Sequence, residues 1–292
     1  MKEKPLLLSV IMITYGHESF IKQAVESILN QQCDFYFELI IANDCSPDNT
    51  DGIINDIIQK HPEAHKIKYL KQNANIGMMP NFLGAINIGR GKYIALCEGD
   101  DYWVDPLKLQ KQLDFLEANP EYTFSMGRVD VLIQESGEIK RMIEHVNPNI
   151  KDTYTLKDYL RNPFSQTSSF VFRNSNKSFP DWFNKVHAGD QSLVVIKTGN
   201  GKIKYHSDLF SIYRLNANSI TFTSNYNVYV KFKETLEYWQ YFLGNDYNFI
   251  LEVLGFKNNQ YIKFSQSKSR IYRGFLVYKI RLINAFLNLF KS

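Results

Sequence analysis

The sequence predicts an α/β protein built on a mostly parallel, doubly wound sheet, and three observations lead to this class. Short apolar, β-branched runs alternate with segments whose apolar residues recur at helical spacing. The runs are apolar throughout, which is typical of strands buried on both faces. Polar loops rich in Asn, Asp, Gly and Ser separate the two kinds of segment. Alternation of this kind indicates parallel strands joined by right-handed helical crossovers.

The first half of the chain predicts four strands, each followed by a helix. The first strand spans 6–14, and apolar residues then recur at helical spacing from Phe20 to Leu29. The other pairs are strand 37–42 with helix 53–58 behind a capping region at Asp48 and Thr50, strand 67–70 with helix 80–88, and strand 93–97 with a helix marked by Leu109, Leu113 and Leu116.

After about residue 119 the pattern becomes mixed. It predicts a hairpin from 123–134 and 139–143 around a turn at 135–138, a strand at 168–173, a short helix at 191–197, and one or two strands within 202–213. Beyond residue 225 the chain is helical and aromatic. We therefore expect a domain at 1–222, with halves at about 1–120 and 121–222, and a helical C-terminal extension at 223–292.

Composition argues against several classes of protein. With 292 residues, 44% of them hydrophobic, the chain is long enough to bury a large core. Its three cysteines, Cys33, Cys45 and Cys97, are widely spaced, which favours reduced thiols in a cytosolic protein over disulfides or a zinc site. The sequence shows neither a classical export signal nor 18 consecutive apolar residues, so we expect no membrane span. The net charge of +4 follows no recognition motif, so we expect no nucleic-acid binding.

Three acids stand where the fourth predicted strand ends. Glu98, Asp100 and Asp101 fall within four residues, and carboxylates at this density repel one another unless a cation offsets them. Hard oxygen donors suit Mg²⁺ or Mn²⁺ bound together with phosphate. The alternative is that the acids face water while Asp105, before Pro106, caps the next helix; capping requires only one acid.

The other predicted strand ends carry polar groups as well. They are Thr14 and Tyr15 after the first strand, Asp44 after the second, and Asn75 and Gly77 after the third. Parallel strands end at one edge of the sheet, where open α/β sheets bind ligands. An aromatic ring for stacking on a base, a carboxylate to accept from its imide, and a metal beside the acids would together form a nucleotide-diphosphate site. Ordinary turn chemistry is the alternative for each residue alone.

Four segments resemble glycosyltransferases of family 2, which have the GT-A fold. They are SVIMITYGHESFIKQAVESILNQ, FELIIANDCSPDNT, NIGMMPNFLGAINIGRGKYIALCEGDDYWVDPLKLQKQLDFLE and GDQSLVVIKTGNGKIKYHSDLFSIYRLNANS, covering roughly residues 8–220. The third, with its CEGDDYW motif, is typical of a bacterial subgroup. The resemblance implies an inverting transferase that uses a nucleotide-activated sugar, commonly a UDP-sugar, with Mn²⁺ or Mg²⁺. The nucleotide-sugar half would be 1–120 and the acceptor half 121–222.

The resemblance also implies roles for particular residues. Tyr15 and Asp44 match residues that contact the base. Asp100 and Asp101 match the acidic motif that contacts ribose and metal, with Glu98 in place of the usual first aspartate. Asp190 matches the catalytic base, and an inverting displacement does require a carboxylate that deprotonates the acceptor hydroxyl. From the sequence alone, the alternative for Asp190 is a helix N-cap.

Further candidates come from the same resemblance. Arg214 matches a basic group close to the leaving phosphates, in a motif where Asn216 replaces the usual His and cannot supply its charge. For the acceptor pocket the candidates are Trp103, Ser168, Ser169 and His187, the last three residues before Asp190. Buried, small strand residues are the alternative for the two serines. His17 also lies beside a matched motif.

The C-terminal tail is basic and aromatic. From Tyr261 to Ser292 there are seven Lys or Arg residues and no acid. The apolar residues among them suit an interfacial helix on an anionic membrane, and a core helix packed on the catalytic domain is the alternative. The resemblance favours the membrane, because the acceptors of such transferases are often lipid-linked. The apolar residues in question are Phe275, Leu276, Ile280, Ile283, Phe286, Leu287 and Phe290.

The function expected from these observations is a metal-dependent hexosyl- or N-acetylhexosaminyltransferase of bacterial surface polysaccharide synthesis, such as capsule or lipopolysaccharide. Its acceptor would be a saccharide or a lipid-linked saccharide, and it would be cytoplasmic, peripheral on the inner face of the membrane. One alternative is a nucleotidyltransferase, which normally shows a glycine-rich basic loop where Tyr15-Gly16-His17-Glu18 stand. The other is a noncatalytic carbohydrate-binding protein, which loss of the acids would have supported.

Overall fold

The computed structural model describes residues 6–141, 150–161, 163–164, 167–175, 178–186, 188–215, 226–267 and 269–289. Contacts divide the chain into two compact units. The first comprises 1–153, 166–178 and 201–216, and the second comprises 154–165, 179–200 and 217–292. The division predicted from the sequence, with boundaries at about residue 120 and at residue 222, separates regions by expected function and not by contacts, and it stays a prediction.

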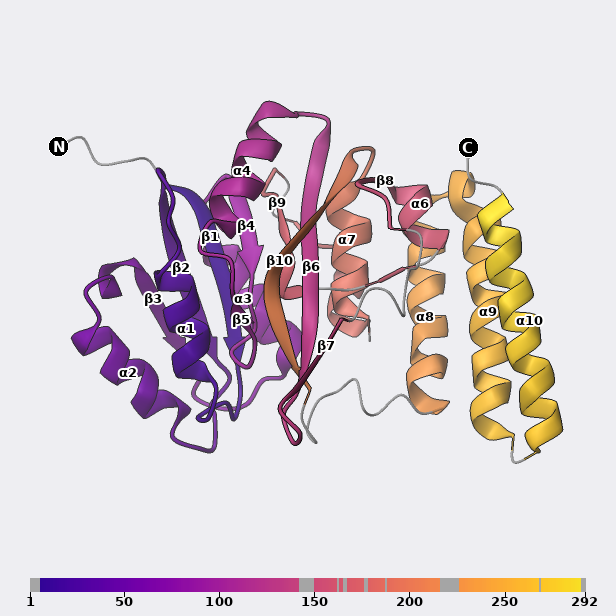
Figure 1. The fold of residues 1–292 in the computed structure, drawn as a ribbon, viewed down its shortest axis with the longest axis horizontal. Helices are drawn as coiled ribbons and strands as arrows, with labels where there is room; N and C mark the ends of the chain where they lie inside the picture. The colour runs from indigo at the N-terminus through magenta and orange to yellow at the C-terminus, as the bar shows by residue number, and fades with distance from the viewer. Residues whose placement is uncertain are drawn as a thin grey trace. The chain divides into compact units, whose positions relative to one another are not determined.

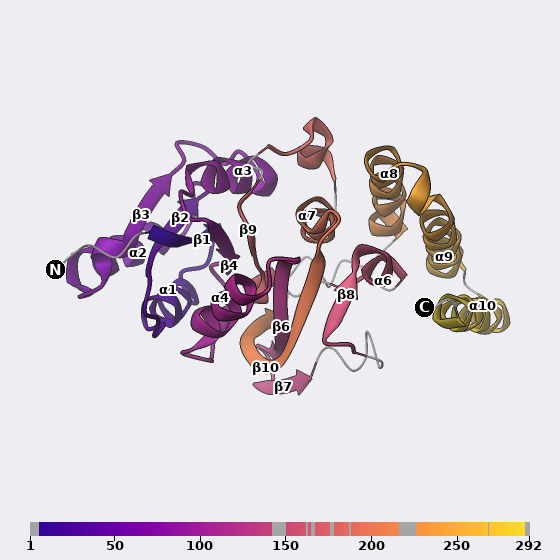
Figure 2. The same ribbon diagram turned by 90° about the horizontal axis from the view of Figure 1, so that it is seen from above.

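The first part of unit 1 confirms the predicted alternation of strands and helices (Figure 1). Its elements are β1 (Leu6–Thr14), α1 (Ile21–Leu29), β2 (Tyr36–Asn43), α2 (Thr50–Lys60), the 3₁₀ turn η1 (Ala64–Lys66), β3 (Ile67–Lys71), α3 (Met78–Ile88) and β4 (Tyr93–Leu96). Strand β1 pairs in parallel with β2 and with β4, and β2 pairs in parallel with β3. Figure 2 shows α3 on one face of this sheet and α1 and α4 on the other.

The sheet continues with a mixed part. Its elements are β5 (Tyr102–Trp103), α4 (Lys108–Ala118), β6 (Tyr122–Ile133), β7 (Glu138–Arg141), η2 (Thr167–Ser169), β9 (Val171–Arg173) and β10 (Lys202–Leu215). The strand order is β3-β2-β1-β4-β9-β6-β10-β5, and β9 runs antiparallel to both β4 and β6. The β6–β7 hairpin is confirmed. The strand expected at 168–173 is wrong at its start, because Thr167–Ser169 forms a 3₁₀ turn, and 202–213 belongs to one strand.

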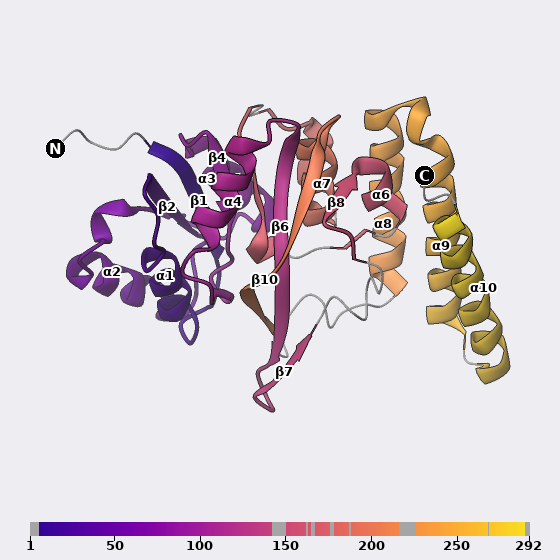
Figure 3. The same cartoon turned by 45° about the horizontal axis from the view of Figure 1, so that its top comes forward.

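Unit 2 is mainly helical, as predicted for the region beyond residue 225. After β8 (Thr153–Thr155), where the two units meet in the sequence, its elements are α6 (Leu156–Arg161), η3 (Asp181–Lys185), α7 (Gly189–Thr198), α8 (Tyr226–Leu243), η5 (Asn245–Tyr247), α9 (Asn248–Gln266) and α10 (Arg270–Leu289). Figure 3 shows α9 and α10 side by side. The Trp239 indole N–H donates to the Ser192 hydroxyl at 3.0 Å, so α8 is held against α7.

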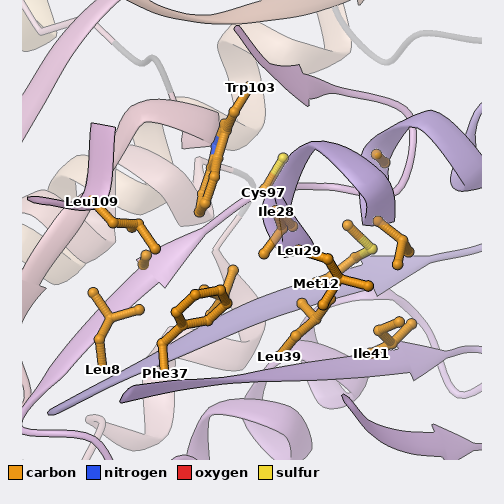
Figure 4. Packing of buried hydrophobic residues seen from close by; sticks show 14 of the residues in the cluster. Leu8, Met12, Ile28, Leu29, Phe37, Leu39, Ile41, Cys97, Trp103 and Leu109 are labelled. Atoms are coloured by element: carbon orange, nitrogen blue, oxygen red, sulfur yellow. The ribbon is translucent and has the colours of Figure 1, made fainter. Parts of the chain in front are cut away.

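The core of unit 1 lies between the sheet and the helices α1 and α4 (Figure 4). Phe37, Leu39 and Leu109 are completely buried, and Trp103 closes the cluster near the end of β4. Each such side chain contributes about 1.5–3 kcal/mol when fully buried. Residues from β1, β2 and β4 interlock here, so the core fixes the strands whose ends carry the candidate site.

Lys108, the first residue of α4, is buried in this core. Its side chain is fully inaccessible, and its ammonium makes no hydrogen bond within the described part of the chain. The Nζ atom instead lies 4.1 Å from the centre of the Trp103 ring, where the ring face attracts a cation. Loss of hydration disfavours the charged form, and burial lowers the pKa of Lys108 from about 10.5 to about 7.

Replacing this lysine by an apolar side chain of similar length tests the cost of its burial. Between pH 7 and 10.5 the unfolded chain holds a proton that the folded chain has lost, so the wild-type free energy of unfolding rises with pH in this window. Lys108→Met removes the group, and we expect higher stability at pH 7 and below, with a flatter pH profile above. Each unit of pKa depression corresponds to about 1.4 kcal/mol.

Urea unfolding at several pH values measures this difference. Lys22→Met, on an exposed side chain of α1, is the matched control and should leave the profile unchanged. A Lys108→Met profile that rises with pH as steeply as the wild type would assign the effect to another group.

Candidate active site

The ends of four parallel strands meet at one edge of the sheet, as predicted. The register of β1 with β2 and β4 brings the loops after Thr14, Asn43 and Leu96 together. Backbone hydrogen bonds extend the pairing past the strand ends: the Asp44 N–H donates to the Thr14 carbonyl at 3.0 Å, and the Gly99 N–H donates to the Ile13 carbonyl at 3.0 Å. Thr14 therefore lies between the second and fourth loops.

Asp44 holds two of these loops together. Its carboxylate is 3% exposed; one oxygen accepts the Ile76 N–H at 2.8 Å and the other accepts the Gly77 N–H at 2.9 Å. Gly77 has a φ of 91°, in the region that favours glycine, and it immediately precedes α3. Asn75 is exposed in the same loop. The structure thus brings together three residues predicted to bind the nucleotide, and it assigns Asp44 a loop-bridging role that sequence analysis did not foresee.

The loop after β1 combines one exposed aromatic ring with a fixed backbone. Tyr15 is 48% exposed, whereas the Thr14 side chain is buried. The backbone is held from the second loop, because the Gly16 N–H donates to the Ser46 hydroxyl and the His17 N–H donates to the Thr50 hydroxyl. The ring of Tyr15 is therefore exposed to solvent on a positioned backbone, and its stacking on a base stays a prediction.

His17 connects this loop with the acidic one. Its Nδ1 atom lies 3.1 Å from the Thr14 hydroxyl, and its Nε2 atom lies 3.8 Å from an Asp100 carboxylate oxygen. Gly99 lies close by, because a Cβ atom there would come within 2.6 Å of the Thr14 hydroxyl oxygen. Only glycine fits between β1 and the acidic loop without a shift.

Asp100 and Asp101 face different surroundings although they are adjacent. The Asp100 side chain is 22% exposed and lies beside His17. The Asp101 side chain is buried; it accepts the Arg214 backbone N–H at 2.9 Å and a hydrogen bond from Ser168. Burial, followed by the charges of Asp100 and Glu98, raises the pKa of Asp101 well above its usual range.

Arg214 lies directly against the acidic loop. One guanidinium nitrogen donates to the Asp100 carbonyl at 2.6 Å and another donates to the Gln23 side chain. The guanidinium also lies over the rings of Phe20 and Tyr102. The local pattern around Gln23, Phe20 and Tyr102 does not identify them as supports of this cation, because they lie between 112 and 194 positions from Arg214 in the sequence.

The predicted metal ligands only partly fit a cation. Their chemistry suits one, since three carboxylates share one loop and the mutual repulsion reflected in the pKa of Asp101 would be relieved by a positive ion. Within the described residues, however, no three His, Cys, Asp or Glu side chains converge to hold a metal. Asp101 is buried and hydrogen-bonded, whereas Asp100 and Glu98 are half-buried, so a cation from solvent can approach these two without displacing the hydrogen bonds of Asp101.

Asp190 belongs to unit 2, where it lies in the first turn of α7. The N-cap of this helix is Ala188, so the alternative of Asp190 as the N-cap is wrong by two residues. Its carboxylate accepts the Gln191 N–H at 2.7 Å. Burial, with a further contribution from the Asp190 charge, raises the pKa of the Tyr159 hydroxyl. His187 and Asn216 lie outside the described residues.

The candidate acceptor residues of unit 1 make hydrogen bonds to other residues of the same unit. The Trp103 indole N–H donates to the Ser168 carbonyl at 2.7 Å, and the Ser168 hydroxyl pairs with that of Ser211 at 2.8 Å. Ser169 is fully buried and accepts the Gly127 N–H at 3.2 Å. These contacts agree with the alternative of buried residues, and contact with an acceptor stays a prediction. Asp105 does not cap α4 as proposed in the other alternative, since the N-cap is Leu107.

Comparison with known proteins gives the family. Residues 9–178 match the family described as glycosyl transferase family 2. This match covers more than half of the chain, and the chain belongs to that family. The CEGDDYW loop and the strand ends described above lie inside the matched segment.

Two relatives illustrate the range of the family. The uncharacterized protein Rv1520 of Mycobacterium tuberculosis is 33% identical over 228 residues, which are 78% of this chain and 64% of that protein. The chain thus spans less than two thirds of that relative's length. A Campylobacter jejuni protein, named GalNAc(5)-diNAcBac-PP-undecaprenol beta-1,3-glucosyltransferase, is 27% identical over 76% of this chain and 69% of its own length.

Solved structures confirm the GT-A fold. S. aureus TarS in complex with UDP-GlcNAc superposes with a TM-score of 0.58 at 17% identity, covering 88% of this chain and 70% of that one. The mannosyltransferase PcManGT from Pyrobaculum calidifontis, in complex with GDP-Man and Mn²⁺, gives a TM-score of 0.62 at 13% identity, covering 98% and 87%. At these identities the likeness concerns the fold alone.

The loop-bridging role of Asp44 can be tested by Asp44→Asn. The amide keeps one acceptor oxygen but places its NH₂ group against one of the two backbone N–H donors, which then loses its partner. We expect a loss of about 1–3 kcal/mol in the free energy of unfolding, measured by urea titration. Asp34→Asn, at an exposed position before β2, should cost almost nothing; equal costs would rule out the bridge.

Proposed function

We propose that the chain is an inverting, metal-dependent glycosyltransferase that uses a nucleotide-diphosphate sugar, a UDP-sugar in the first instance. The observation that carries this proposal is the juxtaposition, at one edge of a parallel sheet, of the exposed Tyr15 ring and the carboxylates of Asp44 and Asp100. The family supports a glycosyl transfer. The complexes of TarS with UDP-GlcNAc and of PcManGT with GDP-Man support a nucleotide sugar as donor.

We assign the nucleotide to the loops of unit 1. Tyr15 would stack on the base, and Thr14, Asp44, Asn75 and Gly77 would line the same loops. Asp100 would lie beside the ribose and diphosphate, with the Arg214 guanidinium beneath that loop as a fixed positive charge. The positive charge of Arg214 would offset the negative charges of the acidic loop and of the incoming phosphates. Its contribution would be the larger because Asn216, which takes the place of the usual His, carries no charge.

A divalent cation completes the proposal. When bound, Mn²⁺ or Mg²⁺ would neutralise the leaving diphosphate. Asp100 would hold it, with Asp101 and Glu98 as further proposed ligands. PcManGT, which was solved with Mn²⁺, supports the choice of metal.

We propose that the acceptor hydroxyl is deprotonated by Asp190. Its oxygen bonds to the anomeric carbon while the bond from that carbon to the donor phosphate oxygen breaks, and the electron pair leaves with the nucleoside diphosphate. The hydroxyl proton goes to the Asp190 carboxylate. Attack from the face opposite the leaving group inverts the anomeric configuration. The assignment rests on the position of Asp190 in its motif.

For the acceptor we propose a saccharide, free or linked to a lipid, in bacterial surface polysaccharide synthesis. The Campylobacter jejuni relative, whose name contains PP-undecaprenol, supports this class. We place the enzyme in the CEGDDYW subgroup, in the cytoplasm and peripheral on the membrane. Among the described residues, no helix combines the length and the apolar character that crossing a bilayer requires.

Metal dependence can be measured without knowing the sugar. We expect calorimetry of UDP binding to show at least about tenfold tighter binding with Mn²⁺ than with EDTA, because the cation screens the diphosphate from the acidic loop. Asp100→Asn should remove most of that difference. Equal affinity in Mn²⁺ and EDTA for the wild-type protein would contradict the metal role.

Asp190→Asn tests the base. The change is nearly isosteric, so UDP binding should stay unchanged, while turnover should fall on the order of 10²–10⁴-fold because the acceptor proton has no recipient. Asp181→Asn, at an exposed site in η3, serves as the matched control and should retain normal turnover. Transfer at the wild-type rate by Asp190→Asn would mean that another residue, with His187 first in line, accepts the proton.

A further inference from the structure

Packing in unit 2 places three of the seven apolar residues predicted for the C-terminal tail, while the side chains of Phe275, Phe286, Leu287 and Phe290 lie outside the described part of the chain. Leu276, Ile280 and Ile283 recur along one face of α10 and are 1%, 8% and 9% exposed. They were expected to contact a membrane or to form a core. Helices α9 and α10 pack against each other, so Leu276 and Ile280 belong to the protein interior, while Ile283 lies at its edge.

A different apolar surface of the same two helices stays open. Phe249 and Phe256 of α9 are 54% and 52% exposed, and Leu282 of α10 is 51% exposed. They line an open groove that we call the α9/α10 groove, made of Phe249, Glu252, Val253, Phe256, Leu282 and Ile283. Positions 249, 253 and 256 are spaced for one face of α9. Half-exposed phenylalanines that line a groove on one helix face form a continuous apolar surface rather than scattered exposed residues.

The two helices that form the groove carry mostly positive charges. From Val253 to the end the sequence contains eight Lys or Arg residues and no Asp or Glu. Lys263 follows Phe256 by two helical turns, and Arg281 directly precedes Leu282; both are exposed. Glu252, in the groove wall, is the one acid of α9 and α10. A partner that covers the groove must therefore accept apolar side chains at its centre and positive charges around them.

We propose that the α9/α10 groove is a docking surface for an anionic phospholipid membrane, with Phe249, Phe256 and Leu282 entering the boundary between headgroups and acyl chains. Lys263 and Arg281 lie on the same helices and pair with lipid phosphates, since long basic side chains reach headgroups while their stems stay in apolar surroundings. A second copy of the chain fits less well, because its groove would bring the same positive charges face to face.

This membrane surface rests on the peripheral location given under the proposed function, yet it can be disproved while the proposed glycosyl transfer still holds. Vesicle binding is measured without nucleotide or acceptor. A protein that transfers sugar but ignores vesicles would therefore overturn this inference alone.

Sedimentation of the full chain with vesicles is the main test. We expect binding to phosphatidylcholine vesicles that contain phosphatidylglycerol, little binding to pure phosphatidylcholine, and weaker binding in high salt. Phe249→Ser combined with Phe256→Ser should weaken binding at least about tenfold, since each removes an exposed apolar ring. Tyr241→Ser is the matched control: Tyr241 is 88% exposed on α8 and does not line the groove.

Charge is tested separately. Arg281→Glu should weaken binding to the anionic vesicles by about fivefold or more, at roughly 1 kcal/mol for each basic group near the surface. Lys233→Glu, the same change of charge at an exposed position of α8, should have a smaller effect. Equal effects would mean that the net charge of the chain, and not this surface, drives binding, and would overturn the proposal.

A conservative variant guards against misfolding of the serine variants. Phe256→Trp keeps an aromatic ring, and vesicles with brominated acyl chains should quench its added fluorescence. Absence of quenching would overturn the proposal. So would wild-type binding by the double serine variant, or a wild-type dimer that the serine variants convert to monomer without any binding to vesicles.

Discussion

Strand β1 pairs in parallel on both sides, and this pairing places the candidate nucleotide site. Because β1 lies between β2 and β4, its end is held by two neighbouring loops: the Thr14 carbonyl accepts from Asp44 and the Ile13 carbonyl accepts from Gly99. The side chain of Thr14 fills the space that a Cβ atom at position 99 would need. A shift of one residue in this register would turn Thr14 outward and separate the two loops that carry the acids.

The acids of the acidic loop differ in their exposure to solvent and in their hydrogen-bond partners. Asp101 gives up hydration and is held by the Arg214 backbone and Ser168, while Asp100 keeps contact with solvent and His17. Burial and the charges of Asp100 and Glu98 disfavour the charged form of Asp101 and raise its pKa, and the hydrogen bonds from the Arg214 backbone and Ser168 counter only part of this effect. The loop therefore combines the half-buried carboxylates of Asp100 and Glu98 with the buried carboxylate of Asp101.

Amphipathic patterning alone does not tell which apolar face of a helix is covered. In α10 the stripe of Leu276, Ile280 and Ile283 is buried, whereas both helices keep exposed apolar side chains: Phe249 and Phe256 on α9, and Val277, Tyr278 and Leu282 on α10. Pattern analysis finds the face with the most apolar residues, and a protein buries that face first. The apolar side chains that stay exposed are those that the packing of α9 against α10 does not cover. They can be identified only when the positions of both helices are known.

The sequence by itself determined the β/α alternation, the strand ends that carry the polar groups, and the helical C-terminal region. These follow from periodicity and from residues a few positions apart, as in the run from Tyr93 to Asp101. Which partners those groups meet depends on the tertiary structure: the guanidinium of Arg214 lies against the loop of Asp100, and Asp44 bridges to Gly77. Arg214 and Asp100 are 114 positions apart. Contacts at such separations depend on how the whole sheet closes, and no local pattern of residues encodes them.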